Sequence, residues 1–192
     1  FNGSLQSWLP FSEPELEKII NRALFWLEEA TPKLLQARER IIKSGALELH
    51  KGVIARKNRQ YELENALNIE INGVAIMKLS RSIKNQNTTP KYAYRWVAEY
   101  AQAIDKVRNA VFVFVALVTG MRIRELGALT FDDITCDKNG DYWIDITRFK
   151  TSHDPNYNGE TERTPLPNYV GNIITSLKLL RSIWTFYKSG IV

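Results

Sequence analysis

The chain has 192 residues, of which 44% are hydrophobic and 24% charged, and its formal net charge is +5. This balance is typical of a soluble globular protein with one or two hydrophobic cores, and it excludes a chain that is disordered throughout. The apolar run from Ala110 to Val118 is too short to span a bilayer, and no signal peptide opens the sequence. A single cysteine, Cys136, excludes an intramolecular disulfide, and His50 and His153 alone cannot complete a zinc-site spacing. We therefore expect a reducing, cytoplasmic setting, no membrane, no metal and no cofactor.

The first predicted helix lies in SEPELEKIINRALFWLEEA, where Ser12 and Glu15 have the spacing of a capping box. Hydrophobic residues then recur on one helical face: Ile19, Ile20, Ala23, Leu24 and Leu27. The pair Thr31-Pro32 is expected to break this helix, because proline lacks the backbone donor that continues it. A second helix is expected over KLLQARERIIKSGA, ending at Gly45.

Residues 51 to 79 favour a helix followed by a short hairpin, because Asn72-Gly73 is a strong turn pair between alternating apolar residues. The following segment, SIKNQNTTPKY, is polar and contains a proline, and it shows no apolar period. We expect it to be a linker or an exposed loop.

The positive charge is concentrated between Lys51 and Arg95, where the only acidic residues are Glu62, Glu64 and Glu70. A local basic excess interleaved with tyrosines suits contacts to nucleic acid, since Lys and Arg neutralise phosphates and release counterions. An ordinary solvated surface is the alternative. The candidate DNA contacts in this stretch are Lys78, Arg81, Lys84, Lys91 and Arg95.

From Tyr92 the pattern predicts a long helix, increasingly apolar on all sides, with Gly120 placed for a left-handed turn at its end. A short helix, roughly Arg122 to Leu129, follows, and then an acidic turn, FDDI. The alternating DYWIDITRFK and the later ERTPLP predict two strands separated by a long loop. An amphipathic helix over residues 168–190 closes the chain. The predicted fold class is mainly α with a small antiparallel β-sheet (α+β).

The order of these parts resembles the first half of the catalytic domain of the tyrosine recombinase (phage integrase) family. The family pattern is close to T-G-hydrophobic-R-x-x-E-L-x-x-L, followed by a W-x-D-I-like turn, a strand carrying a lysine, and an R-x-V-P-L-like strand. The resemblance covers about residues 96 to 192. The matching residues, in chain order, are Thr119, Gly120, Met121, Arg122, Glu125, Leu126, Leu129, Phe131, Asp133, Ile134, Lys150, Arg163, Pro165 and Leu166.

The resemblance assigns roles to particular residues. Members of the family cut DNA by attack of a tyrosine on a backbone phosphodiester. By resemblance, Arg122 stabilises the charge on the phosphate oxygens, because a guanidinium donates two hydrogen bonds and stays charged. Lys150 is the candidate general acid toward the leaving 5′ oxygen. Glu125 would orient or partly neutralise Arg122, or else form an ordinary surface ion pair. Arg124 is either a solvated charge or an additional phosphate contact.

The family's histidine-x-x-arginine motif is not found, because His50 is followed three positions on by Val53 and His153 by Asn156. Neither Tyr169 nor Tyr187 lies after such a motif, so neither is assigned as the nucleophile. This chain alone is therefore expected to cleave no DNA. Its full-length parent is expected to be a site-specific recombinase of a bacterium, phage or mobile element. That parent would bind duplex DNA near the nucleoid as a synaptic tetramer and react through a 3′-phosphotyrosine intermediate.

Several alternatives stay open at this point. Residues 1–90 form either a mostly helical, core-binding-like region ahead of a catalytic half at 91–192, or the opening helix of the catalytic domain followed by a basic insertion. The chain is also compatible with a non-catalytic DNA-binding module on the same fold. A helical protein-interaction domain with an accidental motif match is the third functional class.

Overall fold

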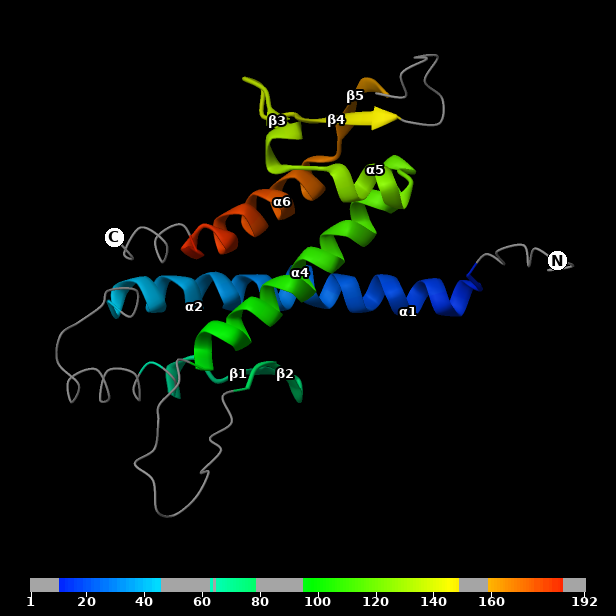
Figure 1. Cartoon of the computed structure of the whole chain (residues 1–192). Helices are drawn as coiled ribbons and strands as arrows, with labels where there is room; N and C mark the ends of the chain where they lie inside the picture. Colours follow the sequence, from blue (N-terminus) through cyan, green and yellow to red (C-terminus); the bar gives the residue numbers. More distant parts are fainter. Residues whose placement is uncertain (1–10, 46–62, 64, 79–94, 149–158, 185–192) are drawn as a thin grey trace, which may run out of the picture.

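The computed structural model describes residues 11–45, 63, 65–78, 95–148 and 159–184. These residues are mainly helical and carry two small antiparallel sheets, so the α+β class is confirmed. Figure 1 shows α1, η1 and α2 as one long rod that α4 crosses, with the hairpin β1–β2 near the start of α4 and the larger sheet near its end. The elements are α1 (Glu13–Leu24), η1 (Phe25–Ala30), α2 (Thr31–Lys43), β1 (Ile69–Ile71), β2 (Val74–Met77), α4 (Arg95–Thr119), α5 (Ile123–Ala128), η2 (Phe131–Asp133), β3 (Ile134–Cys136), β4 (Tyr142–Arg148), β5 (Glu160–Leu166) and α6 (Asn168–Arg181).

The capping box predicted at the start of α1 is confirmed. The backbone N–H of Ser12 donates to Glu15 Oε2 at 2.9 Å, and the Ser12 hydroxyl donates to the same oxygen at 2.7 Å. These bonds satisfy donors that the first turn of a helix leaves without intrahelical partners.

The expected break at Thr31-Pro32 is wrong, because helical backbone runs through this pair. Thr31 has φ −57° and ψ −46°, and its N–H donates to the carbonyl of Trp26, five residues earlier. The Thr31 hydroxyl donates to the same carbonyl at 2.8 Å. In a regular α-helix the ring of Pro32 would clash with the carbonyl four residues before it. The wider π-helical turn η1 leaves room for the ring, so the helix continues into α2.

The hairpin predicted around Asn72-Gly73 is also confirmed. Strands β1 and β2 pair antiparallel, with Ile71 opposite Val74. Asn72 has φ 50° and Gly73 has φ 79°, and positive φ at both central residues defines a type I′ turn. The expected linker over residues 82–92 lies outside the described residues.

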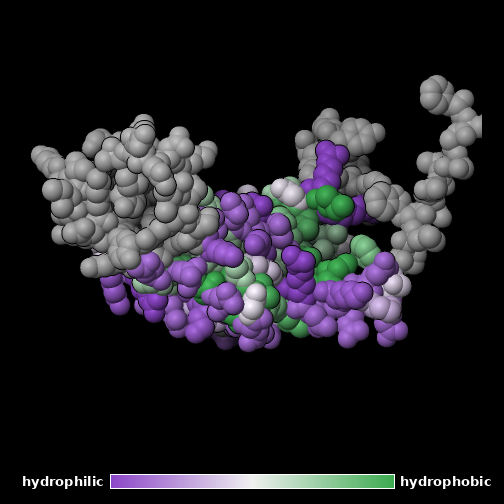
Figure 2. All heavy atoms as spheres, turned by 90° about the horizontal axis from the view of Figure 1, so that it is seen from below, coloured by the Kyte–Doolittle hydropathy of each residue, from purple (hydrophilic) through white to green (hydrophobic). Residues whose placement is uncertain are grey.

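One hydrophobic cluster joins the helices, the hairpin and the larger sheet. One face of helix α4 contributes to this cluster. The long apolar pattern predicted that the later part of the helix would be buried, and the structure corrects this, because Leu117 and Val118 near its end are exposed. Hydrophilic residues predominate on the coloured part of the face seen in Figure 2. The expected division of the chain near residue 90 stays a prediction, and described residues on both sides of it contribute to this cluster. Its fully buried members include Leu34, Ile41, Leu67, Met77, Trp96, Tyr100, Val107, Ile144, Ile146 and Leu180.

The larger sheet has the strand order β3–β4–β5, with both neighbouring pairs antiparallel. The predicted pair β4 and β5 is confirmed. Strand β3 was not predicted, because the acidic FDDI stretch indicated only a turn. The structure has a short 3-10 turn, η2, capped by a hydrogen bond of 2.6 Å from the Thr130 N–H to Asp133 Oδ2. Ile134 then pairs with Ile144 and begins the third strand.

Gly171 lies where α6 meets the sheet. The ring of Tyr142 occupies the space that a Cβ at position 171 would need, and the Tyr142 hydroxyl lies 3.2 Å from Asn172 Oδ1 and 3.3 Å from Thr175 Oγ1. A side chain at Gly171 would therefore displace the Tyr142 ring, which is attached to β4 at one end and hydrogen-bonded to α6 through its hydroxyl at the other.

We expect Gly171→Ala to lower the free energy of unfolding by about 1–3 kcal/mol, the usual cost of overpacking. Gly127→Ala is the matched control, because Gly127 is an exposed helical residue of α5 with open space where its Cβ would lie. That control should be neutral or more stable by up to about 1 kcal/mol, since alanine favours helix over glycine. Denaturant unfolding measures both. Equal effects of the two substitutions would contradict this account of the α6–sheet contact.

Candidate functional site

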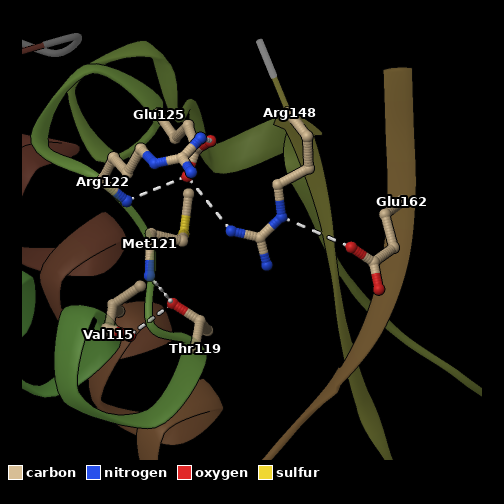
Figure 3. Close-up of polar contacts among 7 residues, drawn as sticks. All are labelled: Val115, Thr119, Met121, Arg122, Glu125, Arg148 and Glu162. Carbon is tan, nitrogen blue, oxygen red and sulfur yellow. Dashed lines mark hydrogen bonds and ion pairs between the residues drawn. The ribbon is translucent and has the colours of Figure 1, made fainter. Parts of the chain in front are cut away.

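The turn between α4 and α5 directs the chain into the candidate site. Gly120 has φ 63°, a conformation that other residues adopt only with strain, and its N–H donates to the carbonyl of Ala116 at 2.9 Å. The Thr119 hydroxyl donates to the carbonyl of Val115 at 2.7 Å and accepts from the Met121 N–H at 3.4 Å. Thr119 and Gly120 therefore end α4 and set the direction in which Arg122 enters α5 (Figure 3).

Glu125 caps the start of α5. Arg122 is the residue before the helix, with extended backbone, and its N–H donates to Glu125 Oε2 at 2.9 Å. A carboxylate in the first turn of a helix accepts from unpaired backbone donors there and is stabilised by the helix dipole. The Glu125 side chain is only 2% exposed, whereas the Arg122 side chain is 49% exposed. The two residues thus lie next to each other in very different environments.

Arg148 reaches the same carboxylate from the sheet. Side chains alternate along a strand, so Arg148 continues the inward-facing row of Ile144 and Ile146, both fully buried. Its Nη1 donates to Glu125 Oε2 at 3.1 Å, and its Nε donates to Glu162 Oε2 on β5 at 3.3 Å (Figure 3). Arg148 therefore connects α5 to two strands of the sheet.

The two arginines contact Glu125 unequally. Arg122 Nη1 lies 3.6 Å from Glu125 Oε1, which is an ionic contact rather than a hydrogen bond. Oε1 is buried and accepts no hydrogen bond from the residues that the structure describes. Burial acts to raise the pKa of the Glu125 carboxyl, but the hydrogen bonds from the Arg122 N–H and Arg148, together with the charges of both arginines, outweigh burial and lower the pKa. Glu125 is therefore a carboxylate at neutral pH.

The structure places some of the other candidate residues and leaves several outside its description. The candidate residues outside the described part of the chain are Lys150, Arg81, Lys84 and Lys91. The side chain of Arg95 is also outside it. Arg124 is an exposed residue of α5, two positions after Arg122 in the sequence. Lys78 is exposed and follows β2, near the opposite end of α4 from α5 (Figure 1). Because α4 has 25 residues and is about 36 Å long, Lys78 and Arg122 are not neighbours.

Arg148 and Glu162 were not among the site residues predicted from the sequence. The strand alternation in DYWIDITR places Arg148 on the same face as two isoleucines, which was a usable signal that this arginine faces inward. Its partner Glu125 lies 23 positions away, and no local pattern indicates that contact.

Arg163, which belongs to the family match, lies on the other face of the sheet. It is opposite Asp145 in the neighbouring strand, and its guanidinium carbon is 5.5 Å from the centre of the Trp143 ring. Its Nη2 donates to Thr135 Oγ1 at 3.1 Å. The structure therefore brings Arg122, Glu125 and Arg148 together and holds Arg163 apart from them.

The described residues contain neither a membrane-spanning helix nor a cluster of metal-binding side chains. No helix among them has both the length and the apolar character needed to cross a membrane. Within the same ranges, no three histidine, cysteine, aspartate or glutamate side chains cluster in a way that could hold a metal ion.

The lowered pKa of Glu125 predicts a pH-dependent stability. The unfolded chain takes up a proton near the ordinary carboxyl pKa of 4.5, above the pKa of the folded protein, so this stability is present above pH 4.5 and lost as pH falls through the lower value. We expect the free energy of unfolding to fall more steeply below pH 4.5 in the unchanged protein than in Glu125→Gln. Denaturant unfolding from about pH 7 to about pH 3 measures this slope. Glu17→Gln, which removes an exposed carboxylate of α1, is the control and should keep the steeper slope.

A scan against protein-family models found no match to this chain. Searches of curated proteins and of solved structures also found no match. The functional interpretation therefore rests on the residues around Glu125 and on their geometry.

Proposed function

We propose that this chain is the front half of a tyrosine-recombinase-like catalytic domain and that Arg122 binds a phosphate of duplex DNA. In a protein that also supplies the second arginine and the tyrosine, this half would serve a site-specific recombinase that cuts and rejoins strands through a 3′-phosphotyrosine intermediate. Such a protein would act as a synaptic tetramer on DNA, at the nucleoid of a bacterial or mobile-element host.

The observation that carries this proposal is the half-exposed guanidinium of Arg122 beside a carboxylate that another arginine already neutralises. If Glu125 neutralised the Arg122 guanidinium completely, little net positive charge would remain there to bind a ligand. Of the two guanidinium groups, that of Arg148 donates a hydrogen bond to the carboxylate, whereas that of Arg122 makes only the longer ionic contact. The Arg122 guanidinium is planar and permanently charged, and its side chain is 49% exposed, so it suits a phosphate group.

The order of the elements supports the same reading. A long, partly buried helix ends at Thr119 and is followed by Gly120, Arg122 precedes a short helix, and an antiparallel sheet follows, in the order that the family pattern has at these positions. The expected general acid, Lys150, comes two residues after Arg148 in the sequence.

A non-catalytic DNA-binding module is the second candidate. The lack of a histidine-x-x-arginine motif in these 192 residues is compatible with it, and it uses the same phosphate contact at Arg122. Both candidates therefore predict DNA binding by this chain, and neither predicts that this chain cleaves DNA alone. The third class, a helical protein-interaction domain, predicts no such binding.

We expect this chain to bind duplex DNA with an affinity that falls steeply as salt increases. Arg122→Ala and Lys150→Ala should each weaken binding and reduce the slope of log affinity against log salt by about 0.9, the contribution of one phosphate contact. Fluorescence anisotropy of a labelled duplex across a salt series measures both quantities.

Lys43→Ala is the matched control, since it removes one positive charge from the exposed end of α2. This variant should keep the slope of the unchanged protein. Strong binding that is indifferent to Arg122→Ala would place the DNA surface elsewhere and overturn the proposal. Binding that is absent, or independent of salt, would favour the protein-interaction class.

A further inference from the structure

The two arginines at Glu125 have different roles. The family resemblance assigns a role to Arg122 and none to Arg148. We propose that Arg148 is a positioning residue: it neutralises the buried Glu125 carboxylate and so leaves the Arg122 guanidinium for a DNA phosphate. The proposal rests on the proposed function, because it presumes that Arg122 binds phosphate.

A buried carboxylate needs a charged partner. Removing an ionised carboxylate from water is costly unless hydrogen bonds and opposite charge compensate for it. Glu125 is 2% exposed and has two guanidinium groups within 4 Å. Only Arg148 meets hydrogen-bond geometry, at 3.1 Å, and its side chain is 23% exposed. Arg148 is therefore the main compensating charge for Glu125.

Two carboxylates hold Arg148 in place. Its Nη1 is bonded to Glu125 on α5 and its Nε to Glu162 on β5. Both of these donors point at protein oxygens, and the strand alternation directs the side chain inward from β4. A guanidinium held from two sides is suited to fixing a carboxylate rather than to following a ligand.

Arg122 is the group that would respond if Arg148 were lost. Its Nη1 already lies 3.6 Å from Glu125 Oε1, and that oxygen is buried with no hydrogen bond. A shift of less than an ångström would bring the pair to hydrogen-bond distance. Arg122 would then satisfy the unbonded oxygen and present less of its charge to DNA. Arg148 thus affects DNA binding through Arg122 and not by touching the phosphate.

The test is a double-mutant cycle on duplex DNA affinity, measured at one salt concentration and with each variant shown to be folded by circular dichroism. Arg148→Ala should weaken binding by about tenfold, the size expected for one charge-assisted hydrogen bond.

In an Arg122→Ala background the same substitution should change DNA affinity by less than about twofold, because Arg148 affects binding only through the Arg122 guanidinium, which this background lacks. Adding Glu125→Gln to Arg148→Ala should restore most of the lost affinity, since the uncharged amide no longer draws Arg122 inward.

Arg148→Gln provides a second route if Arg148→Ala does not fold, because glutamine removes the charge and the Nη1 donor to Glu125 but keeps a polar amide near the position of the arginine Nε, which faces Glu162. The same cycle and the same rescue by Glu125→Gln are expected for it. An equal loss in both backgrounds would make Arg148 a direct phosphate contact and overturn the inference. So would unchanged affinity on removing Arg148, or a loss that Glu125→Gln does not restore. If Arg122→Ala itself has no effect, the proposed function fails and the inference fails with it.

Discussion

The buried carboxylate of Glu125 is the constraint on which the candidate site depends. It lies in the first turn of a short helix, and it must be compensated because it is removed from water. The compensation comes from a backbone N–H in its own turn and from an arginine of the neighbouring sheet. These bonds connect α5 to β4 and fix the place from which the Arg122 side chain leaves the backbone.

The rest of the fold makes that junction possible. One face of helix α4 is buried in the hydrophobic cluster from Trp96 as far as Val115, close to the end of the helix at Thr119. The positive φ of Gly120 then turns the chain toward α5 within one residue. On the other side, fully buried Ile144 and Ile146 fix the face of β4, and Arg148 follows in the same row. A polar cluster therefore forms at the edge of a hydrophobic core, where the positions of its members are determined by packing.

Helix caps, turns and helix ends were predictable from the sequence, because they depend on hydrogen bonds and backbone conformations among residues close together in the chain. The capping box of Ser12 and Glu15, the turn at Asn72-Gly73 and the end of α4 at Gly120 all depend on residues within one turn of each other. The break expected at Thr31-Pro32 failed because a π-helical turn relieved the clash that normally stops a helix before proline.

The candidate site was only partly predictable, for a different physical reason. Arg122 and Glu125 share one turn and were identified together, whereas Arg148 meets them across 23 positions of sequence. Glu125 is likewise buried where α5 contacts both α4 and β4, and the contact with β4 is not visible in the local sequence. The short strand β3 was missed because three residues carry too little alternation to indicate a strand.

The central claim is that Arg122 meets DNA while Arg148 stays with Glu125. The most direct measurement is the side-chain Nε–Hε signal of each arginine in a nuclear magnetic resonance titration with duplex DNA, assigned through Arg122→Lys and Arg148→Lys. The Arg122 signal should shift and saturate with DNA, and the Arg148 signal should stay close to its position in the free protein. A shift of the Arg148 signal with no response from Arg122 would contradict the account.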